Sequence, residues 1–327
     1  MLPLFVTIAL AADAPEAPTV EVNGLVFAHW GLDLSDGAEA YNEFALDRAY
    51  LGAKAKITKK IGARITLDAD HMKAVETDTG EFTYDTKYRV FVKYAYVEFK
   101  DLAPGLKLRA GVIDTPYQPV QDNFWGHRYV HMGLADQEKM LYTADLGVAL
   151  TGEHGKGLFS WSAGAYNGEG YSKLELDAGK SFQARVTVDP LARGGKQELP
   201  ITGFVNVSTH ADADPTITYV GALGFKMPFF WFLGEYIGVS EGDAGKQGIS
   251  VSALPGLPKY GRLVLRYDHY DPDTTTDADG YDKIIGGVSH DFADKVSVAA
   301  TYERQMFEAD DGAAPAHGVF LHMQAGF

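Results

Sequence analysis

Few residues of this chain have the types and spacing that bond-breaking chemistry requires. Cysteine is absent, which excludes a thiolate nucleophile, a thiolate zinc site and a disulfide scaffold. Ser160, Ser162, Ser250 and Ser252 lie outside any G-x-S-x-G setting, so the sequence predicts no nucleophile elbow. We therefore expect no catalytic residues and no cofactor.

Two groups of side chains have spacings that are relevant to metal binding. His127 and His131 are four residues apart, which would put both on one face of a helix, but no helix is evident there. Residues 271–280 are rich in aspartate, yet Gly280 is not at the sixth position of a calcium loop that starts at Asp271 or Asp277. We interpret the histidines as a loop pair and residues 271–280 as a solvated acidic loop, and we predict no metal centre.

Charged side chains show a more regular pattern, because they occupy every second position of many segments. In residues 61–70, apolar residues alternate with polar ones that include Arg64, Asp68 and Asp70, and residues 182–189 alternate in the same way. Successive side chains of a β-strand point to opposite faces. One face of each segment is thus apolar, while the other tolerates full charges.

Sixteen segments with this alternation lie between turn signals, and none of the intervening stretches shows a long helical period. They are residues 19–33, 43–57, 60–74, 87–100, 105–115, 142–152, 157–168, 180–190, 199–210, 215–226, 229–240, 246–255, 259–270, 281–291, 294–306 and 316–327. No stretch approaches the ~18 apolar residues of a spanning helix. An α-helical membrane protein is excluded, whereas a β-strand one is not.

Two all-β architectures fit this pattern, a soluble sandwich and a membrane barrel. A sandwich core is packed with large residues, but here the apolar face has many small ones and aromatic residues gather near strand ends. The aromatic residues are Trp30, Tyr94, Tyr96, Trp161, Phe230, Phe232, Tyr236, Tyr267 and Tyr302. Aromatic girdles flank the apolar band of a barrel in a bilayer. We predict an all-β, 16-stranded antiparallel transmembrane β-barrel, with a sandwich as the alternative.

The connections between the segments alternate in length. Those after even-numbered segments are short, whereas residues 33–43, 74–86, 271–280 and 307–315 form longer acidic connections. An even-stranded barrel with both termini on one side places its short turns there and its long loops opposite, as in bacterial outer-membrane barrels. The loops also explain the net charge of −15, from 29 basic and 44 acidic residues, which argues against a nucleic-acid partner.

The two ends of the sequence carry sorting features. Residues 1–11 contain an apolar run and an A-x-A site, which predicts a signal peptide, followed by a short periplasmic segment at 12–18 and the barrel at 19–327. No Lys or Arg precedes the apolar run, so an ordinary buried segment is the alternative. Counting back by twos from Phe327 gives only apolar residues as far as Val319, which resembles the assembly signal that barrel-assembly machinery reads.

A barrel of sixteen strands encloses an aqueous channel whose lining must be polar. The predicted lining comprises the basic residues Arg48, Lys54, Lys56, Arg64, Arg89, Lys93, Lys107, Arg109, Arg185, Arg262 and Arg266 and the acidic residues Asp68, Asp70, Asp189, Glu235, Asp268 and Glu303. The register of residues 88–100 stays open, because Val97 and Phe99 compete with Tyr94 and Tyr96 for the outer face. The excess of bases favours a weak anion preference, although the acidic external mouth acts against it.

The third external connection, between Thr115 and Leu141, is the longest. Long loops in compact architectures are usually functional, and this one mixes aromatic residues with Asp122 and Arg128. We predict that it folds into the lumen and narrows the pore, with Arg128 or Asp122 facing inward charges. A surface loop that packs on its own aromatic residues is the alternative.

Several segments carry short motifs at strand and loop positions. They are residues 43–56 (EFALDRAYLGAKAK), 105–125 (GLKLRAGVIDTPYQPVQDNFW), 145–148, 167–170 and 266–272. These segments resemble the phosphate-selective porin O and P type family of Gram-negative outer-membrane porins. Residues 105–125 are similar to its strand-and-loop segment, in which a proline motif opens the third loop, residues 43–56 resemble its R-A-x-L-G-x-K strand, and the others resemble its later strands.

The resemblance implies a trimeric, 16-stranded barrel that conducts small solutes. Phosphate-selective members cluster lysines in the constriction loops, whereas residues 116–141 hold only Arg128 and Lys139 as cations, so phosphate specificity does not carry over.

The expected function is therefore an outer-membrane channel for passive diffusion of small hydrophilic solutes and ions. Its expected partners are membrane lipids, lipopolysaccharide bridged to acidic loops by divalent ions, the assembly machinery and two further copies of the chain. The alternatives are a barrel with a plugged lumen that serves binding or adhesion, and a barrel hydrolase.

Overall fold

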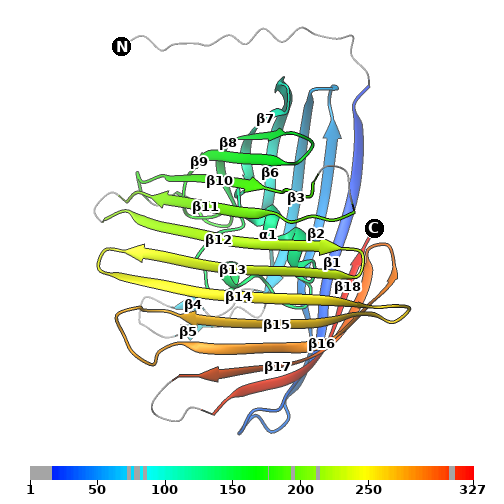
Figure 1. Cartoon of the computed structure of the whole chain (residues 1–327), viewed down its shortest axis with the longest axis vertical. Coiled ribbons are helices and arrows are strands. Elements are labelled where there is room, and N and C mark those ends of the chain that lie inside the picture. Colours follow the sequence, from blue (N-terminus) through cyan, green and yellow to red (C-terminus); the bar gives the residue numbers. More distant parts are fainter. Residues whose placement is uncertain are drawn as a thin grey trace.

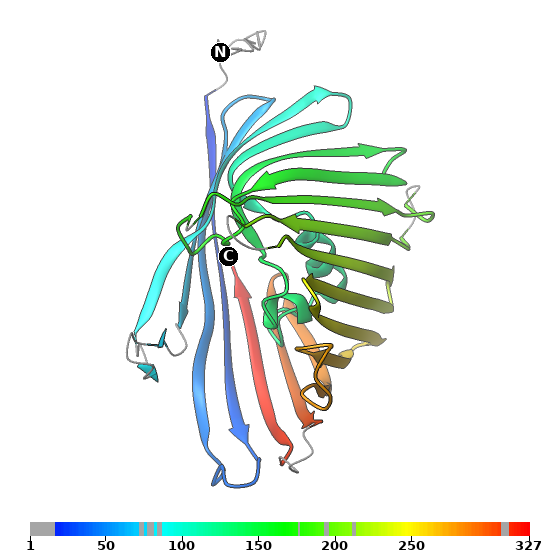
Figure 2. The same cartoon turned by 90° about the vertical axis from the view of Figure 1, so that its left-hand side faces the viewer.

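The computed structural model is a closed antiparallel β-barrel of sixteen strands (Figure 1). It describes residues 17–71, 75–76, 82–83, 87–175, 177–192, 196–210, 214–308 and 314–327, so the predicted signal peptide at 1–11 and most of 12–18 lie outside the described residues. The barrel strands are β1 (Thr19–Asp33), β2 (Asn42–Lys56), β3 (Ile61–His71), β6 (Tyr88–Ala103), β7 (Leu106–Asp114), β8 (Ala144–His154), β9 (Phe159–Tyr166), β10 (Ser181–Val188), β11 (Ile201–Ser208), β12 (Thr216–Met227), β13 (Phe230–Glu241), β14 (Ala244–Leu257), β15 (Gly261–Asp271), β16 (Tyr281–Ala293), β17 (Val296–Phe307) and β18 (Ala316–Gly326). Each strand pairs with its neighbours along the chain, and β1 pairs with β18 to close the ring (Figure 2).

Sixteen barrel strands confirm the predicted fold class, and each overlaps its predicted segment. The alternation that predicted them is visible in β10, where Phe182, Val186 and Val188 are exposed while Gln183 and Thr187 are buried. Apolar side chains thus cover the outside, and polar ones point inward. This is the distribution that a barrel in a bilayer requires.

Short elements in the connections depart from the strands-only prediction. β4 (Val75–Glu76) and β5 (Phe82–Thr83) form a small hairpin within the connection between β3 and β6. α1 (Gln118–Trp125) and α2 (Leu134–Gln137) lie between β7 and β8. The expectation that this connection contains no helix is wrong, because helices of eight and four residues are too short for a helical period to stand out. Neither is long and apolar enough to cross a membrane, nor is any other helix of the described residues.

A β-bulge settles the open register of residues 88–100. Thr66 of β3 pairs with Tyr94 and the next residue, Leu67, pairs with Val92, so Lys93 is the extra residue of β6. Beyond the bulge Val97 is exposed on the outer face, whereas Tyr94 shares the inner face with Arg64. The alternation changes phase at the bulge. The assignment of Tyr94 and its inner-face neighbour Tyr96 to an outer aromatic girdle is therefore wrong.

The lengths of the connections follow the predicted asymmetry with two exceptions. At the end with the short turns, residues 189–200 form a longer connection. At the opposite end a tight hairpin joins β13 to β14, with Gly242 at φ 63°. Asp189 accepts hydrogen bonds from the backbone N–H groups of Leu191 and Leu199, both at 2.9 Å. Asp189 therefore organises a turn at this end of the barrel, beyond the end of β10.

Candidate functional site

The connection between β7 and β8, residues 115–143, is attached to strands that lie far from it in the sequence. Its ends meet through a hydrogen bond from the Thr115 N–H to the Thr143 carbonyl at 3.2 Å. Between them, α1 contacts β12 and β13, and α2 contacts β14. We call residues 115–143 the loop segment.

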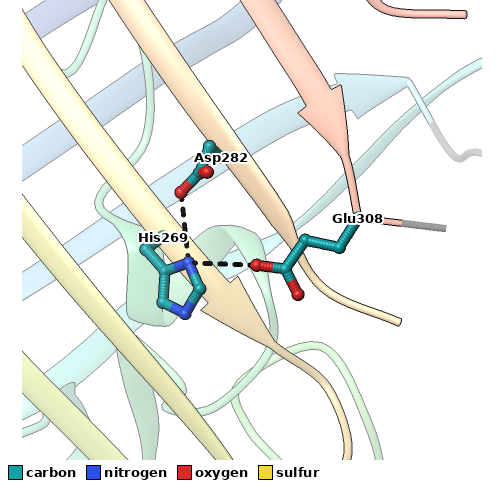
Figure 3. Close-up of side chains that lie close together, drawn as sticks. All are labelled: His269, Asp282 and Glu308. Atoms are coloured by element: carbon teal, nitrogen blue, oxygen red, sulfur yellow. Dashed lines mark hydrogen bonds and ion pairs between the residues drawn. The ribbon is translucent and has the colours of Figure 1, made fainter. Parts of the chain in front are cut away.

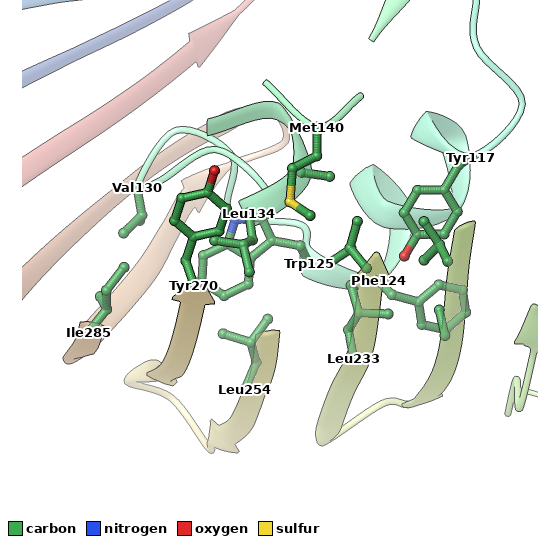
Figure 4. Close-up of a cluster of buried hydrophobic side chains, with 14 of the residues drawn as sticks. Tyr117, Phe124, Trp125, Val130, Leu134, Met140, Leu233, Leu254, Tyr270 and Ile285 are labelled. Carbon is green, nitrogen blue, oxygen red and sulfur yellow. The ribbon is translucent and has the colours of Figure 1, made fainter. Parts of the chain in front are cut away.

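A hydrophobic cluster joins the loop segment to the inner faces of the strands that it contacts (Figure 4). Phe124 and Leu134 of the loop segment pack in this cluster with Leu233, Leu254 and Ile285 of the barrel wall, all at most 4% exposed. The prediction that the inner wall is uniformly polar is wrong on this side, because the loop segment covers the apolar positions and keeps water from them.

Two glycines of the wall leave room for this packing. A Cβ at Gly224 of β12 would lie 2.8 Å from Phe124 Cδ1, and a Cβ at Gly248 of β14 would lie 2.7 Å from Leu134 Cδ2. Side chains at these positions would push the loop segment away. The glycines thus let the two helices approach the wall closely.

Glu235 is the buried carboxylate that anchors α1. It is 5% exposed and accepts hydrogen bonds from the Tyr117 hydroxyl and from Gln121 Nε2, the latter at 2.8 Å. A buried carboxylate needs such partners, because its desolvation is otherwise costly. Glu235 was predicted as a lining residue; it belongs to β13 and lies buried beneath α1, and its part in a channel lining stays a prediction.

His127 and His131 each bind a different wall residue and do not face a shared ligand. His127 Nε2 lies 2.9 Å from Ser289 Oγ, and His131 Nε2 lies 3.1 Å from Lys283 Nζ. Burial lowers the pKa of His127 to about 4 and that of His131 to about 3, the latter with help from the Lys283 and Arg266 charges. Both rings are neutral at pH 7, so His131 Nε2 can accept a hydrogen bond from the Lys283 ammonium.

The His127–Ser289 pair lacks the third member that nucleophilic catalysis needs. The other ring nitrogen, Nδ1, lies 3.3 Å from the Trp125 carbonyl oxygen, where a hydrolase would place a carboxylate. Both side chains are 5% exposed, so a substrate has no access to the serine. The pair therefore serves as an attachment of the loop segment.

Charges within the loop segment pair with one another. Arg128 Nη2 donates to Asp136 Oδ2 at 2.9 Å, and Arg128 Nη1 lies 3.8 Å from Asp122 Oδ2. Asp122 also accepts a hydrogen bond from Gln118 Nε2 at 2.7 Å. This internal ion pair rigidifies the segment between its two helices. Asp68 and Lys93 of the wall also lie within electrostatic reach, and the expectation that Arg128 or Asp122 faces charges of the wall stays a prediction.

The wall opposite β13 carries a second charge group. Arg48 Nη1 of β2 lies 2.9 Å from both Asp68 Oδ2 and Asp70 Oδ2 of β3. Arg48 Nη2 also lies 3.9 Å from Met132 Sδ, and the Tyr171 hydroxyl donates to Asp68 Oδ2 at 3.4 Å. The loop segment thus contacts β2 as well as β12 to β16.

Met132 contacts both the Arg48 group and a third charge group, which consists of Arg266 and Asp268. Its carbonyl accepts a hydrogen bond from Arg266 Nη1 of β15 at 2.7 Å. Arg266 also pairs with Asp268 at 2.8 Å and lies over the Trp125 ring. Both members of the pair are nearly fully buried, so the loop segment shields them from water.

Arg64, Lys93 and Arg185 are among the predicted cations of the lining that form no salt bridge within the described part of the chain. Arg64 donates to Thr66 and lies 4.2 Å from the centre of the Tyr94 ring. Lys93 donates to Thr143 and lies 4.0 Å from the centre of the Tyr171 ring, while Arg185 donates to Ser160 and Thr187. Neutral hydroxyls and aromatic faces hold these cations, and no carboxylate lies within salt-bridge distance of them.

The remaining predicted residues have other surroundings. Arg109 pairs with Glu98 and Asp114, Arg262 lies 4.2 Å from the centre of the Trp231 ring, and Glu303 Oε1 lies 3.9 Å from His322 Nε2. In the register of neighbouring strands, Lys54 lies opposite Arg64, Lys56 opposite Gly62, Arg89 opposite Asp70 and Lys107 opposite Thr151.

Sequence reasoning missed the polar residues that attach the loop segment, namely Gln121, Glu138, Tyr281 and Lys283. Tyr281 of β16 donates to Glu138 Oε1 at 2.7 Å, and Lys283 contacts His131. Lys283, Ile285 and Ser289 are separated by even numbers of residues, so they share one face of β16. This spacing could have placed Lys283 on the inner face.

The predicted assembly signal lies at the closing seam. Phe327 and Gly24 exchange backbone hydrogen bonds at 3.0 and 3.2 Å. A Cβ at Gly24 would lie 2.2 Å from the Phe327 ring, so the ring covers the glycine backbone. This geometry ties the end of the described chain to β1.

Solved structures similar to this chain share its architecture at low sequence identity. An anion-selective porin from Comamonas acidovorans is 13% identical, with a TM-score of 0.64 over 95% of this chain and 100% of that chain. OprB of Pseudomonas putida is 7% identical, with a TM-score of 0.68 over 95% and 94%. A trimer form of OmpT, an outer membrane protein of Vibrio cholerae, is 13% identical, with a TM-score of 0.60 over 95% and 100%.

No family model and no curated protein sequence matches the chain. The likeness is therefore one of fold, the 16-stranded barrel of outer-membrane porins. The barrel and these neighbours point to the outer membrane of a Gram-negative bacterium. The finer resemblance to phosphate-selective porins of the O and P type stays a prediction.

Proposed function

We propose that this protein is an outer-membrane porin for the passive diffusion of small hydrophilic solutes and ions. The observation that carries the proposal is a closed 16-stranded barrel whose outer face is apolar and whose inner face carries polar and charged side chains. Barrels of this size enclose water. Diffusion needs no bond chemistry, so the function requires no catalytic group.

The loop segment forms the constriction in this proposal. It leaves the wall after β7, contacts β12 to β16 through α1, α2 and the residues between them, and reaches Arg48 of β2. A segment with contacts on both sides of the barrel interior narrows the path for solutes. Its internal Arg128–Asp136 ion pair would keep the narrowing rigid.

The proposed ion preference is weakly anionic. Arg48, Arg109 and Arg266 are neutralised by carboxylates, whereas Arg64 and Arg185 are cations with neutral partners. Confined charges are screened less than those of the solvated external loops, so they dominate ion selection. The anion-selective porin of Comamonas acidovorans has the same fold, which is compatible with this preference.

Planar-bilayer recording tests both statements. We expect discrete conductance steps, and in a potassium chloride gradient a reversal potential of the sign that anion preference gives. The double variant Arg64→Gln, Arg185→Gln should move this potential towards zero or beyond, whereas Lys139→Gln, at an exposed position of the loop segment, should leave it close to wild type. Cation preference in the wild type would refute the ionic part of the proposal.

A plugged barrel for binding or adhesion is the second candidate, and one observation favours it. Asp68 of β3 and Lys93 of β6, on the inner face, are at most 1% exposed, so this part of the interior is filled. A folded protein that never conducts would support the plug. Hydrolysis of phospholipid or peptide by the detergent-solubilised protein would support a barrel hydrolase instead.

Assembly completes the proposal. We propose a homotrimer, in line with the trimer form of the OmpT fold neighbour, surrounded by lipids and lipopolysaccharide. Residues 1–11 would act as the signal peptide and Phe327 as the residue that the assembly machinery reads. Analytical ultracentrifugation in detergent and N-terminal sequencing of the exported protein test the trimer and the cleavage site.

A further inference from the structure

Three side chains with metal-ligating atoms meet at the loop end of β15, β16 and β17 (Figure 3). His269 belongs to β15, Asp282 belongs to β16, and Glu308 directly follows β17. His269 Nδ1 lies 3.1 Å from Asp282 Oδ1 and 3.8 Å from Glu308 Oε1, and one ligand atom from each residue lies within 4.8 Å of the others. We propose that these residues bind one divalent transition-metal ion, of the zinc class.

The cluster lies on the outside of the barrel, away from the candidate channel. Arg266, Asp268 and Tyr270 of β15 are buried on the inner face, so His269 between them points outward beside the exposed Tyr267. The side chains of the three ligands are 29–39% exposed. An ion held there keeps positions open for water, and its binding does not depend on the proposed channel function.

The donor set selects the kind of ion. One imidazole nitrogen with two carboxylate oxygens suits zinc and its neighbours, whereas calcium and magnesium prefer oxygen ligands alone. Atoms bound to one zinc ion at about 2.0–2.2 Å lie roughly 3–3.6 Å apart. His269 and Asp282 already have this separation, and the partly exposed Glu308 carboxylate reaches it by a small rotation.

Charge also favours a dication. Asp282 and Glu308 both approach His269, and no lysine or arginine of the described residues forms a salt bridge with either carboxylate. The two carboxylates bring two negative charges to one place. A dication offsets both, in a region where residues 271–280 add further aspartates.

Two neighbours support the ligands from behind. The Tyr267 hydroxyl donates a hydrogen bond to Asp282 Oδ1 at 2.6 Å, an arrangement that orients a ligating carboxylate. The Glu308 N–H donates to the Gly280 carbonyl at 3.0 Å, and a Cβ at Gly280 would lie 2.9 Å from Glu308 Oε2. Gly280 therefore fixes the backbone of Glu308 and leaves space for its side chain.

A second group of carboxylates serves as an internal comparison. Glu169, Glu175 and Asp177 also have ligand atoms within 4.8 Å of one another. This group has no nitrogen ligand, Lys180 neutralises Glu175 at 2.9 Å, and Asp177 accepts a hydrogen bond from the Gly179 N–H. We expect no zinc binding there, so Glu169→Gln is a matched control.

The experiment measures zinc binding by isothermal titration to the full-length protein in detergent, without a histidine tag. We expect one strong site per chain, lost in His269→Ala and Glu308→Gln and weakened about 10–100-fold in Tyr267→Phe. Glu169→Gln and the exposed His210→Ala should bind as wild type does. Cobalt titration of the wild type should show the absorption bands of a low-symmetry site with nitrogen ligation.

The outcomes separate clearly. Equal zinc binding by wild type and His269→Ala overturns the proposal, as does wild-type protein that binds no zinc or gives only the spectrum of aqueous cobalt. Unchanged heat-modifiable migration on gels shows that each variant is folded. All of these substitutions lie outside the loop segment, so a channel that still conducts after them leaves the porin proposal intact whatever the zinc result.

Discussion

At the scale of single residues, Glu235 is the main polar attachment of the loop segment to the barrel wall. It is buried among apolar neighbours and is kept there by Tyr117 and Gln121. Removing one donor leaves part of a buried carboxylate without a partner, which is more costly than the loss of an exposed hydrogen bond. The first prediction follows from this difference between buried and exposed hydrogen bonds.

Replacing Tyr117 by phenylalanine should loosen the loop segment without opening the barrel. We expect the free energy needed to detach α1 from the barrel wall to fall by about 1–3 kcal/mol. Hydrogen exchange of residues 117–125 measures this loss. Tyr142→Phe is the control, because the Tyr142 ring is 38% exposed in the same segment. Equal protection of α1 in both variants would contradict the anchoring role.

Acidification should also weaken the attachment of the loop segment. The pKa values of His127 and His131 are lowered by burial to about 4 and about 3, so both rings stay neutral in the packed segment. A released segment takes up protons below about pH 6.5. The packed state therefore has its full stability above that pH and loses it as the pH falls towards 4.

Single-channel recording across this pH range tests whether acidification loosens the loop segment. We expect more frequent conductance changes as the pH falls, and a smaller effect in the double variant His127→Gln, His131→Gln, whose amides do not titrate. A channel that becomes quieter at low pH would show that the histidines do not hold the segment in this way.

At the scale of elements, the two helices fit the wall because glycines face them. Gly224→Val should overpack the contact with Phe124 and displace α1, at a cost of about 1–3 kcal/mol. Gly221→Val on the same strand is the control, since a Cβ there meets nothing within 4 Å. Limited proteolysis should cut the loop segment faster in the first variant only, and equal rates would contradict the close fit.

The strands could be predicted from the sequence almost completely, because each keeps one face in contact with lipid. That constraint repeats every two residues and leaves a pattern such as Phe182, Val186 and Val188. The bulge at Lys93 interrupts the pattern by one residue, which is why the register there could not be decided. Only the pairing with β3 reveals the extra residue.

The site was much less predictable than the wall. The charged lining residues follow from the phase of each strand, but their partners do not. Arg128 pairs with Asp136 inside the loop segment, and Leu233 and Leu254 face inward because that segment covers them. The first fact depends on a contact between residues eight positions apart in an irregular segment, and the second on contacts between residues about a hundred positions apart. The period of a strand contains no information about either.

At the scale of the whole molecule, the barrel depends on the seam between β1 and β18. Phe327→Ala should reduce the yield of folded barrel in the membrane, because it removes the ring that covers Gly24 and the proposed assembly signal. Phe292→Ala, at another exposed aromatic position, should have little effect. Heat-modifiable migration on gels measures the folded fraction, and equal yields would refute a special role for Phe327.

The seam also dictates when this molecule can mature. Its closing contacts join residues about three hundred positions apart, such as Leu25 and Gly326, so both must have been synthesised before the ring can form. Until then β1 and β18 are unpaired edges, which are prone to stick to other chains. We therefore expect the newly made polypeptide to need an escort that covers these edges until the seam forms.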